Sequence, residues 1–158
     1  MQPLVYDAGM TIFDRLIAGE LPASFVHQDE RCVAFMDINP ISRGHVLVVP
    51  RVSKPTLAEL DADLSAHLWR VAQRIALAQQ RALGSRAQHF LVNDGKAASQ
   101  TVPHVHLHVI PRYAGDTLQT VGRLVWHITT LTLRRPETAA RRQRLDEIAR
   151  RIGEQLAV

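Results

Sequence analysis

Residues 104–110 read His-Val-His-Leu-His-Val-Ile, and this alternation of imidazole and aliphatic side chains decides our prediction of the fold. Successive side chains of a β-strand point to opposite faces of the sheet, so a strand here puts three histidines on one face. The aliphatic face can pack on a core, whereas each imidazole has two ring nitrogens that need polar partners. We therefore predict a strand over Val105–Ile110 whose histidine face belongs to a functional site.

Two chemistries suit such a row of imidazoles. His-x-His on a strand can bind zinc, with a further ligand supplied by His27, His45 or His89. Alternatively, a neutral imidazole attacks phosphorus and forms a phosphoramidate, while neighbouring donors hold the phosphate oxygens. The polar residues 99–101 directly before the row suit the second chemistry without excluding the first.

Turn residues and periodicity predict the remaining elements. Thr11 caps a short helix over Ile12–Ala18, and Asp61–Leu83 is the longest helix, closed by Gly84. Short turns between the strands favour an α+β fold with a mainly antiparallel sheet. The other predicted strands are Ser24–His27, Cys32–Asp37, His45–Val49 and Gln88–Val92.

The last part of the chain differs from the rest. Residues 112–136 show no clear pattern, and a helical pattern begins at Pro136 with an aliphatic stripe and arginines elsewhere. The net charge of the chain is +4. Residues 1–111 are balanced, so the whole excess lies after them, which argues against a basic nucleic-acid-binding domain.

Length and composition bound the class of protein. The chain has 158 residues, of which 46% are hydrophobic and 22% charged, typical of one globular domain. The single cysteine, Cys32, excludes an internal disulfide and a cysteine-rich zinc site, and we predict that it is inert core. No apolar stretch is long enough to span a membrane, and the N-terminus lacks the features of a signal peptide. We expect a cytoplasmic protein without membrane contact.

Five segments, in order and at matching spacing, resemble the histidine triad (HIT) family of nucleotide hydrolases and transferases. They cover residues 11–113, which leaves a flexible lead-in over 1–10 and a C-terminal extension over 114–158. The segments are Ile12-Phe13 with Gly19–Pro22, Ala34–Pro40, Gly44–Arg51, Phe90–Gly95 and Gln100–Val109.

The resemblance implies a role for each histidine. His106 would be the nucleophile that becomes nucleotidylated at the α-phosphorus, and His108 would donate to the phosphate oxygens. His104 and His45 would orient the other rings. Further positions of this sequence would bind the base, ribose or phosphates, with Asp37 on the ribose and Gln100 shaping the phosphate loop. These nucleotide-binding positions are Ile12, Phe13, Phe35, Asp37, Ile38, Asn93, Ser99, Gln100 and Thr101.

The resemblance also implies a substrate class and a partner. A phosphoanhydride or phosphoramidate of a purine nucleoside, adenosine favoured, would be cleaved to a nucleoside monophosphate without a metal. The protein would be a homodimer that pairs the long helix and a sheet edge. Apart from the resemblance, Trp69 is either half-buried on its helix or a dimer contact, and Trp126 either packs on the body or reaches the partner's site. Relatives with a structural zinc have cysteines where this chain has Thr11 and Asp14, so we predict none here.

Three alternatives stay open. The histidine row could serve a metal-dependent hydrolase, or the domain could bind nucleotides without turnover. Nucleic-acid binding would depend on the arginine-rich tail alone, and we expect none.

Overall fold

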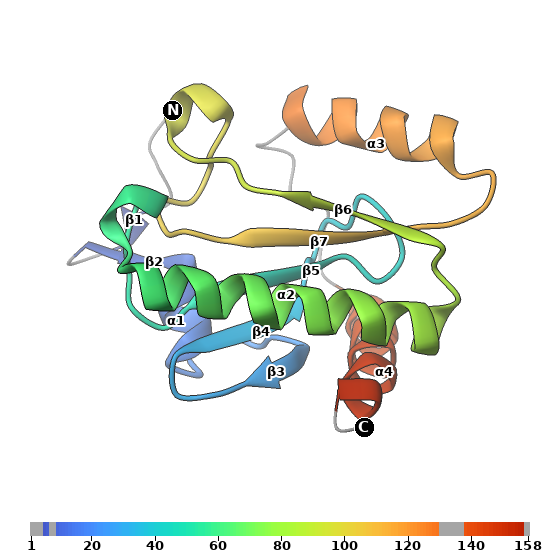
Figure 1. The fold of residues 1–158 in the computed structure, drawn as a ribbon, viewed down its shortest axis with the longest axis horizontal. Coiled ribbons are helices and arrows are strands. Elements are labelled where there is room, and N and C mark those ends of the chain that lie inside the picture. Colours follow the sequence, from blue (N-terminus) through green and yellow to red (C-terminus); the bar gives the residue numbers. More distant parts are fainter. Residues whose placement is uncertain (1–4, 7–8, 130–137, 157–158) are drawn as a thin grey trace.

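A five-stranded antiparallel sheet forms the centre of the protein (Figure 1). The computed structural model describes residues 5–6, 9–129 and 138–156. The strands lie in the order β3-β4-β5-β7-β6, and every neighbouring pair is antiparallel, as predicted. Their bounds are β3 Phe25–Gln28, β4 Cys32–Met36, β5 Val46–Pro50, β6 Ala87–Leu91 and β7 Leu107–Arg112.

Helices cover both faces and one end of this sheet. α2 lies along one face, while α1 lies on the other side with a small hairpin made by β1 and β2 (Figure 1). That hairpin places a strand in the predicted lead-in over residues 1–10. The bounds are β1 Val5–Tyr6, β2 Met10–Thr11, α1 Ile12–Ile17, α2 Ala62–Leu83, α3 Thr117–Thr129 and α4 Ala139–Leu156, with short 3-10 turns η2 Leu57–Glu59 and η3 Lys96–Ala98.

The alternation of strand side chains splits the core into two clusters. On β4, Cys32, Ala34 and Met36 join the cluster under α2, whereas Val33 and Phe35 join the cluster under α1. Cys32 is completely buried, and burial with the nearby Asp29 carboxylate raises the pKa of its thiol to about 12. The buried position predicted for Cys32 is therefore confirmed.

The predicted long helix is confirmed almost to the residue. Asp61 caps its first turn by accepting from the Leu64 N–H, and Gly84 ends it in the left-handed conformation. Leu64, Leu68 and Ile75 lie on the stripe that faces the sheet. The buried Gln79 donates from the same helix to the carbonyls of residues 44 and 109, which ties α2 to β7 and to the loop before β5.

The arginine-rich helix is part of the same fold. The pattern predicted to begin at Pro136, which lies outside the described residues, gives α4 from Ala139. Leu145, Ala149 and Ile152 of α4 are buried in the cluster that α2 covers. A Cβ on Gly153 would lie 3.2 Å from the Val26 carbonyl of β3, so this helix approaches the sheet backbone closely.

α3 is an element that the pattern did not predict. Its Thr120 N–H donates to the carbonyl of Asp116, directly before the first turn. Leu118, Val121 and Val125 recur at helical spacing, and they are 90%, 51% and 55% exposed, so this aliphatic stripe faces solvent. This spacing of three and four residues is the usual sequence signal of an amphipathic helix, and the prediction overlooked it.

The strand that contains the histidine row starts later than predicted. β7 begins at Leu107 instead of Val105, because the Val105 N–H donates to the Lys54 carbonyl outside the sheet. Only His108 of the row thus lies within a strand. The alternation of faces nevertheless extends upstream, since Val105, Leu107 and Val109 all join the core under α2.

Gly44 generates a prediction about stability. Its φ is +89°, and a Cβ there would overlap the Leu83 side chain and lie 3.3 Å from Pro111 Cγ. Gly44→Ala adds left-handed strain to this overlap, so we expect the free energy of unfolding to fall by about 2–4 kcal/mol. Chemical denaturation measures the change.

Gly84→Ala is the matched control, because Gly84 has φ +73° and a Cβ added there would have no atom within 4 Å. Gly84→Ala therefore adds left-handed strain without an overlap, and we expect its free energy of unfolding to fall by about 1–2 kcal/mol. Equal losses in the two variants would contradict the proposed close packing at Gly44.

Candidate active site

The pairing of β5 with β7 brings four histidines together. In that register Leu47 lies opposite His108, so His45, which directly precedes β5, lies beside the end of the histidine row. The ring centroids are 5.1 Å apart for His45 and His108 and 4.9 Å for His106 and His108. All four histidines are at most 5% exposed, with His104 joining them from the turn before β7.

His106 is held in one tautomer. Its Nδ1 lies 2.8 Å from the His104 carbonyl oxygen. Because a carbonyl can only accept, Nδ1 carries the proton, and Nε2 of a neutral ring then presents a lone pair. That is the form in which an imidazole acts as a nucleophile.

A chain of hydrogen bonds orients His108. The Ile41 N–H donates to His45 Nδ1 over 3.2 Å, so the proton of His45 lies on Nε2. His45 Nε2 is 3.0 Å from His108 Nδ1 and donates to it. His108 consequently carries its own proton on Nε2, which makes that atom a donor.

His104 belongs to a buried polar network at the start of α1. Its Nε2 donates to the Pro50 carbonyl over 2.8 Å, which leaves Nδ1 as the acceptor. The Thr11 and Ser53 hydroxyls lie 3.1 and 3.4 Å from Nδ1, and both also reach Asp14 Oδ2. Burial lowers the pKa of His104 by more than the Pro50 bond and the Asp14 charge raise it, so the ring is held neutral.

The Asp14 carboxylate stays ionised in this network. Burial raises the pKa of Asp14, but hydrogen bonds from the N–H and hydroxyl of Thr11 outweigh it, helped by His104 and Ser53, and hold that pKa below its ordinary value. The bond from the Thr11 N–H is one half of the capping box of α1, and the Asp14 N–H donates to Thr11 Oγ1 as the other half, so one cluster both starts the helix and positions His104.

Asp37 lies at the end of β4, close to His45. One carboxylate oxygen accepts the Asn39 N–H over 2.7 Å, and the other is 3.4 Å from His45 Nδ1. That second distance is longer than an ordinary hydrogen bond, so we assign the tautomer of His45 to the Ile41 N–H. Ligand atoms of Asp37, His45 and His108 lie within 4.8 Å of one another, which is close enough to surround a metal ion.

The polar loop before the histidine row is closed by Gln100. Its Oε1 accepts the Gly95 N–H over 2.7 Å, and its Nε2 donates to the Pro55 carbonyl over 2.8 Å. Ser99 has a φ of +65°, rare for a residue with a side chain and frequent at functional sites. Asn93 and Thr101 lie in or beside the same loop, and no described contact joins either of them to a histidine ring.

The predicted apolar slot is brought together only in part. Phe13 packs edge-on against Phe35 at 5.6 Å and against His106 at 5.1 Å, and Ile12 packs on the same cluster. Ile38 instead packs against the core under α2. The Ile38 side chain is only partly buried, so its place in a nucleotide slot stays a prediction.

α4 contacts the segment that follows Asp37, which the sequence pattern did not indicate. The Arg141 guanidinium donates to the Ile38 carbonyl and to Asn39 Oδ1. The Arg142 guanidinium donates to Ser24 Oγ and the Pro22 carbonyl. Only the folded chain reveals these contacts, since their partners lie more than a hundred positions apart.

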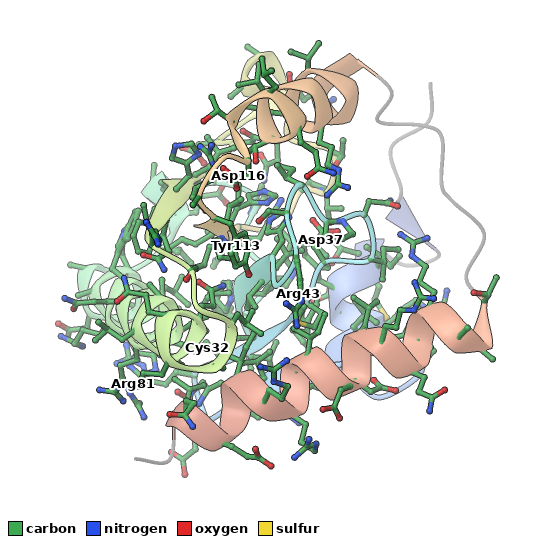
Figure 2. All side chains as sticks on the ribbon, turned by 90° about the vertical axis from the view of Figure 1, so that its right-hand side faces the viewer. Cys32, Asp37, Arg43, Arg81, Tyr113 and Asp116 are labelled. Atoms are coloured by element: carbon green, nitrogen blue, oxygen red, sulfur yellow. The ribbon has the colours of Figure 1, made fainter. Side chains whose placement is uncertain are left out.

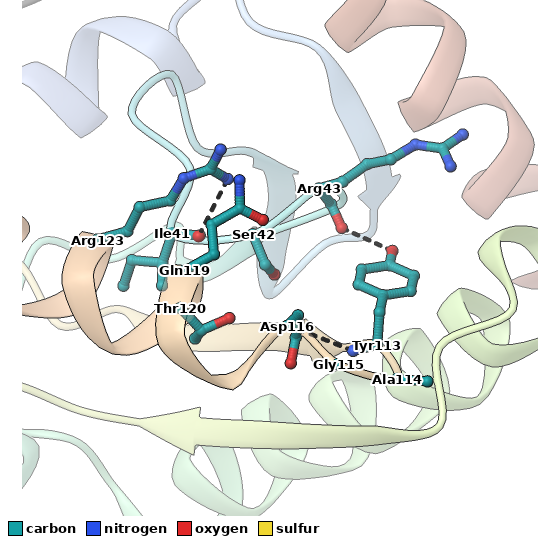
Figure 3. A pocket seen from close by; sticks show the side chains of 10 residues that line it. All are labelled: Ile41, Ser42, Arg43, Tyr113, Ala114, Gly115, Asp116, Gln119, Thr120 and Arg123. Carbon is teal, nitrogen blue, oxygen red and sulfur yellow. Dashed lines mark hydrogen bonds between the residues drawn. The ribbon is translucent and has the colours of Figure 1, made fainter.

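A pocket of about 420 Å³ lies beside the loop that carries Ile41 (Figure 3). In Figure 3 the Arg123 side chain extends from α3 toward the Ile41 carbonyl, and the Tyr113 hydroxyl donates to the Arg43 carbonyl. The pocket contains none of the predicted site residues. Its lining residues are Ile41, Ser42, Arg43, Tyr113, Ala114, Gly115, Asp116, Gln119, Thr120 and Arg123.

Comparison with known proteins identifies the architecture around this histidine row. The family model of the HIT domain matches residues 18–115. The chain belongs to the histidine triad family. A HIT-like protein of Mycobacterium tuberculosis is 42% identical over 107 residues, which are 68% of this chain and 74% of the relative.

Two further members of the HIT family bear on fold and chemistry. The crystal structure of a zinc-bound histidine triad family protein from Mycobacterium smegmatis aligns with a TM-score of 0.73 and 33% identity, covering 92% of each chain. An adenylylsulfatase of Arabidopsis thaliana is 37% identical over 107 residues, which are 68% of this chain and 54% of the relative. Membership of the HIT family supports a nucleotide-binding hydrolase or transferase in general.

The neutral His104 generates a prediction about pH. Its folded-state pKa is below the ordinary value of 6.5, so the unfolded chain binds a proton that the folded chain does not. The free energy of unfolding should therefore fall as the pH drops below about 6.5, by at most about 1.4 kcal/mol per pH unit from this one group.

His104→Gln keeps a donor for the Pro50 carbonyl but cannot titrate, so it should lose this part of the slope. Denaturant unfolding at a series of pH values measures it, with the exposed His89→Gln as the control. An unchanged slope in His104→Gln would contradict a buried neutral ring.

Proposed function

We propose that the protein hydrolyses or transfers nucleotides through a covalent nucleotidyl-His106 intermediate. The observation that carries the proposal is the hydrogen bond from His106 Nδ1–H to the His104 carbonyl, which leaves Nε2 with a lone pair. The same carbonyl supports the ring when attack makes it positive. The general class of activity follows from the family, and the intermediate is our own assignment.

Each step of the proposed reaction uses an atom already oriented in the free protein. His106 Nε2 attacks the α-phosphorus and forms a nitrogen–phosphorus bond, while the leaving group departs with the electron pair of its bond to phosphorus. His108 Nε2–H donates to a non-bridging oxygen. Water then attacks the same phosphorus, the bond to His106 breaks, and a nucleoside monophosphate is released.

We assign the nucleotide to the surroundings of this row. Phe13, Phe35 and Ile12 offer apolar surface to a purine base, and the Asp37 oxygen that does not accept the Asn39 N–H accepts from a ribose hydroxyl. The closed loop with Asn93, Ser99 and Thr101 supplies polar groups to the phosphates. The Ile38 carbonyl accepts from the Arg141 guanidinium, which anchors the segment after Asp37.

We propose an adenosine phosphoanhydride or phosphoramidate as the substrate. The Arabidopsis relative is named as an adenylylsulfatase, which supports an adenylyl group joined to an acidic leaving group. A panel of adenosine phosphoramidate, diadenosine polyphosphates and adenylyl sulfate, compared by kcat/KM, identifies the leaving group.

His106→Gly tests the covalent step. We expect kcat to fall by about 10⁴-fold or more, because the nucleophile is missing, while the variant stays folded and binds adenosine monophosphate. Alkaline denaturation of the wild type during turnover should trap a mass increase of one nucleotidyl group.

His89→Gly, at an exposed position on β6, is the control and should turn over normally. Full activity of His106→Gly would overturn the covalent mechanism. Loss of wild-type activity in chelator, with the protein still folded, would instead favour a metal-dependent hydrolase built on Asp37, His45 and His108. Binding of adenosine monophosphate without turnover of any substrate would favour a binding module.

A structural zinc at the start of α1 does not suit the residues present. Thr11, Asp14, Ser53 and His104 do meet there, but they offer two hydroxyls, one carboxylate and one imidazole. Zinc in structural sites prefers thiolates and imidazoles. Hydrogen bonds already join all four residues, so we propose that this network replaces a metal in holding α1 against His104.

We further propose a cytoplasmic homodimer that uses the edge strand β6 and α2. Among the described strands β6 pairs with β7 alone, so we assign its other edge to a strand of the partner. Trp69 of α2 and Phe90 of β6 lie 6.1 Å apart and are 43% and 42% exposed. Trp126 lies in α3, and its side chain is outside the described residues. Within the described residues no helix is long and apolar enough to cross a bilayer.

Trp69→Glu tests this interface. A charge in the apolar patch should convert the dimer to a monomer, measured by light scattering on a size-exclusion column over a range of concentrations. Leu118→Glu is the control, since Leu118 is 90% exposed on α3 and outside the patch. A monomeric wild type, or dimer loss only in Leu118→Glu, would contradict the proposed interface.

A further inference from the structure

A second cluster of metal-binding residue types lies at the turn between β3 and β4. Asp29 is the centre of this turn, and three side chains from three elements point to its carboxylate. His27 of β3 and His67 of α2 each place Nε2 2.8 Å from Asp29 Oδ2. Cys32, the first residue of β4, places Sγ 3.6 Å from the same oxygen. We call His27, Asp29, Cys32 and His67 the turn cluster.

Asp29 Oδ2 has more hydrogen-bond donors around it than it has lone pairs. Its Oδ1 accepts the backbone N–H groups of Arg31 and Cys32 over 2.8 and 2.7 Å, which orients the carboxylate. That leaves the two lone pairs of Oδ2 for three donor atoms. A cation among these atoms would use the same side chains without requiring one oxygen to accept three times.

The ligand set is one that suits zinc. Imidazole nitrogen, thiolate sulfur and carboxylate oxygen are its protein ligands, and four of them in a tetrahedron form a structural site. Bond lengths near 2.0–2.3 Å put neighbouring ligand atoms about 3.3–3.6 Å apart in such a site. Ligand atoms of His27, Asp29 and Cys32 lie within 4.8 Å of one another, so shifts of about an ångström would bring these three to bonding positions, and His67 Nε2 lies 2.8 Å from Asp29 Oδ2.

We propose that the turn cluster binds a thiophilic divalent metal ion of the zinc type. His27, Asp29 and Cys32 form the core of the site, and His67 supplies the fourth ligand from α2. On binding, the Cys32 thiol releases its proton to solvent, and the two imidazoles move their protons from Nε2 to Nδ1. No electron is transferred.

Burial and charge around the turn cluster are compatible with a metal. The side chains of His27, Asp29 and His67 are 18–28% exposed, so an ion can enter, while Cys32 is fully buried behind them. Two arginines lie nearby, but both have other partners. Arg31 is 3.9 Å from Asp61, and Arg51 Nε donates to the Asp29 carbonyl. The carboxylate and thiolate offset their charge.

The turn cluster is separate from the histidine row. Cys32 begins β4 and Asp37 follows its last residue, so the two sites lie at opposite ends of the strand, roughly 16 Å apart along it. Figure 2 labels both residues, and they lie apart in that view as well. A metal here would pin the β3–β4 turn to α2 and take no part in the proposed reaction, so the two proposals can fail independently.

Cobalt(II) titration of the full, metal-stripped chain tests the proposal. Because Cys32 is the only cysteine in the sequence, a thiolate-to-cobalt charge-transfer band can arise only at this site. We expect one equivalent of cobalt to produce that band, zinc to abolish it by displacement, and bound zinc to raise Tm.

Variants assign the remaining ligands. His27→Gln and His67→Gln each keep a side-chain N–H donor for Asp29 but remove a ligand, so each should weaken cobalt binding by at least about tenfold. Cys32→Ala removes the thiol but alters the fully buried core. The side chains of His27 and His67 are partly exposed, so their variants test the site without changing that core. His89→Gln and Asp14→Asn are controls, the second excluding the network at the start of α1, and should bind normally.

Three results would overturn the proposal. They are the absence of cobalt binding at concentrations well above those of the protein, binding without a thiolate band, and unchanged affinity in both His27→Gln and His67→Gln.

Discussion

The site depends on the antiparallel register between β5 and β7. That register sets Leu47 opposite His108, and His45 therefore reaches His108 with a 3.0 Å hydrogen bond. A shift by one residue would turn every side chain of β7 to the other face and put an aliphatic side chain in the place of His108. Gln79 reinforces the register from α2, because its amide donates to the carbonyls of Gly44 and Val109 on the two sides of the pairing.

Backbone groups around the histidines also fix which ring nitrogen carries the proton. Three of the rings meet a backbone group that admits only one tautomer: the His104 carbonyl for His106, the Pro50 carbonyl for His104, and the Ile41 N–H for His45. A lone pair on His106 and a donor on His108 are thus in place before a substrate binds. Such preorganisation lowers the reorganisation that a reaction would otherwise require.

Much of the fold followed from local pattern, and the misses have physical causes. The Asp61 cap, the buried stripe and Gly84 are local signals, so the long helix was predicted nearly to its ends. α3 was missed although Leu118, Val121 and Val125 recur at helical spacing, and their exposure shows that this stripe does not pack on the core. The contacts of Arg141 with the segment after Asp37 could not be predicted, because they join positions more than a hundred residues apart.

The sequence by itself determined that three histidines alternate with aliphatic residues and that five segments match the HIT family, since both are properties of neighbouring residues. Only the tertiary structure decided which protons the rings of His104 and His108 carry, because their partners lie 54 and 63 positions away. It also decided what α4 does: buried Leu145 and Ile152 hold its aliphatic stripe against the core, and Arg141 spans to the segment after Asp37. The turn cluster likewise exists only in the fold, where α2 brings His67 to a carboxylate 38 positions away.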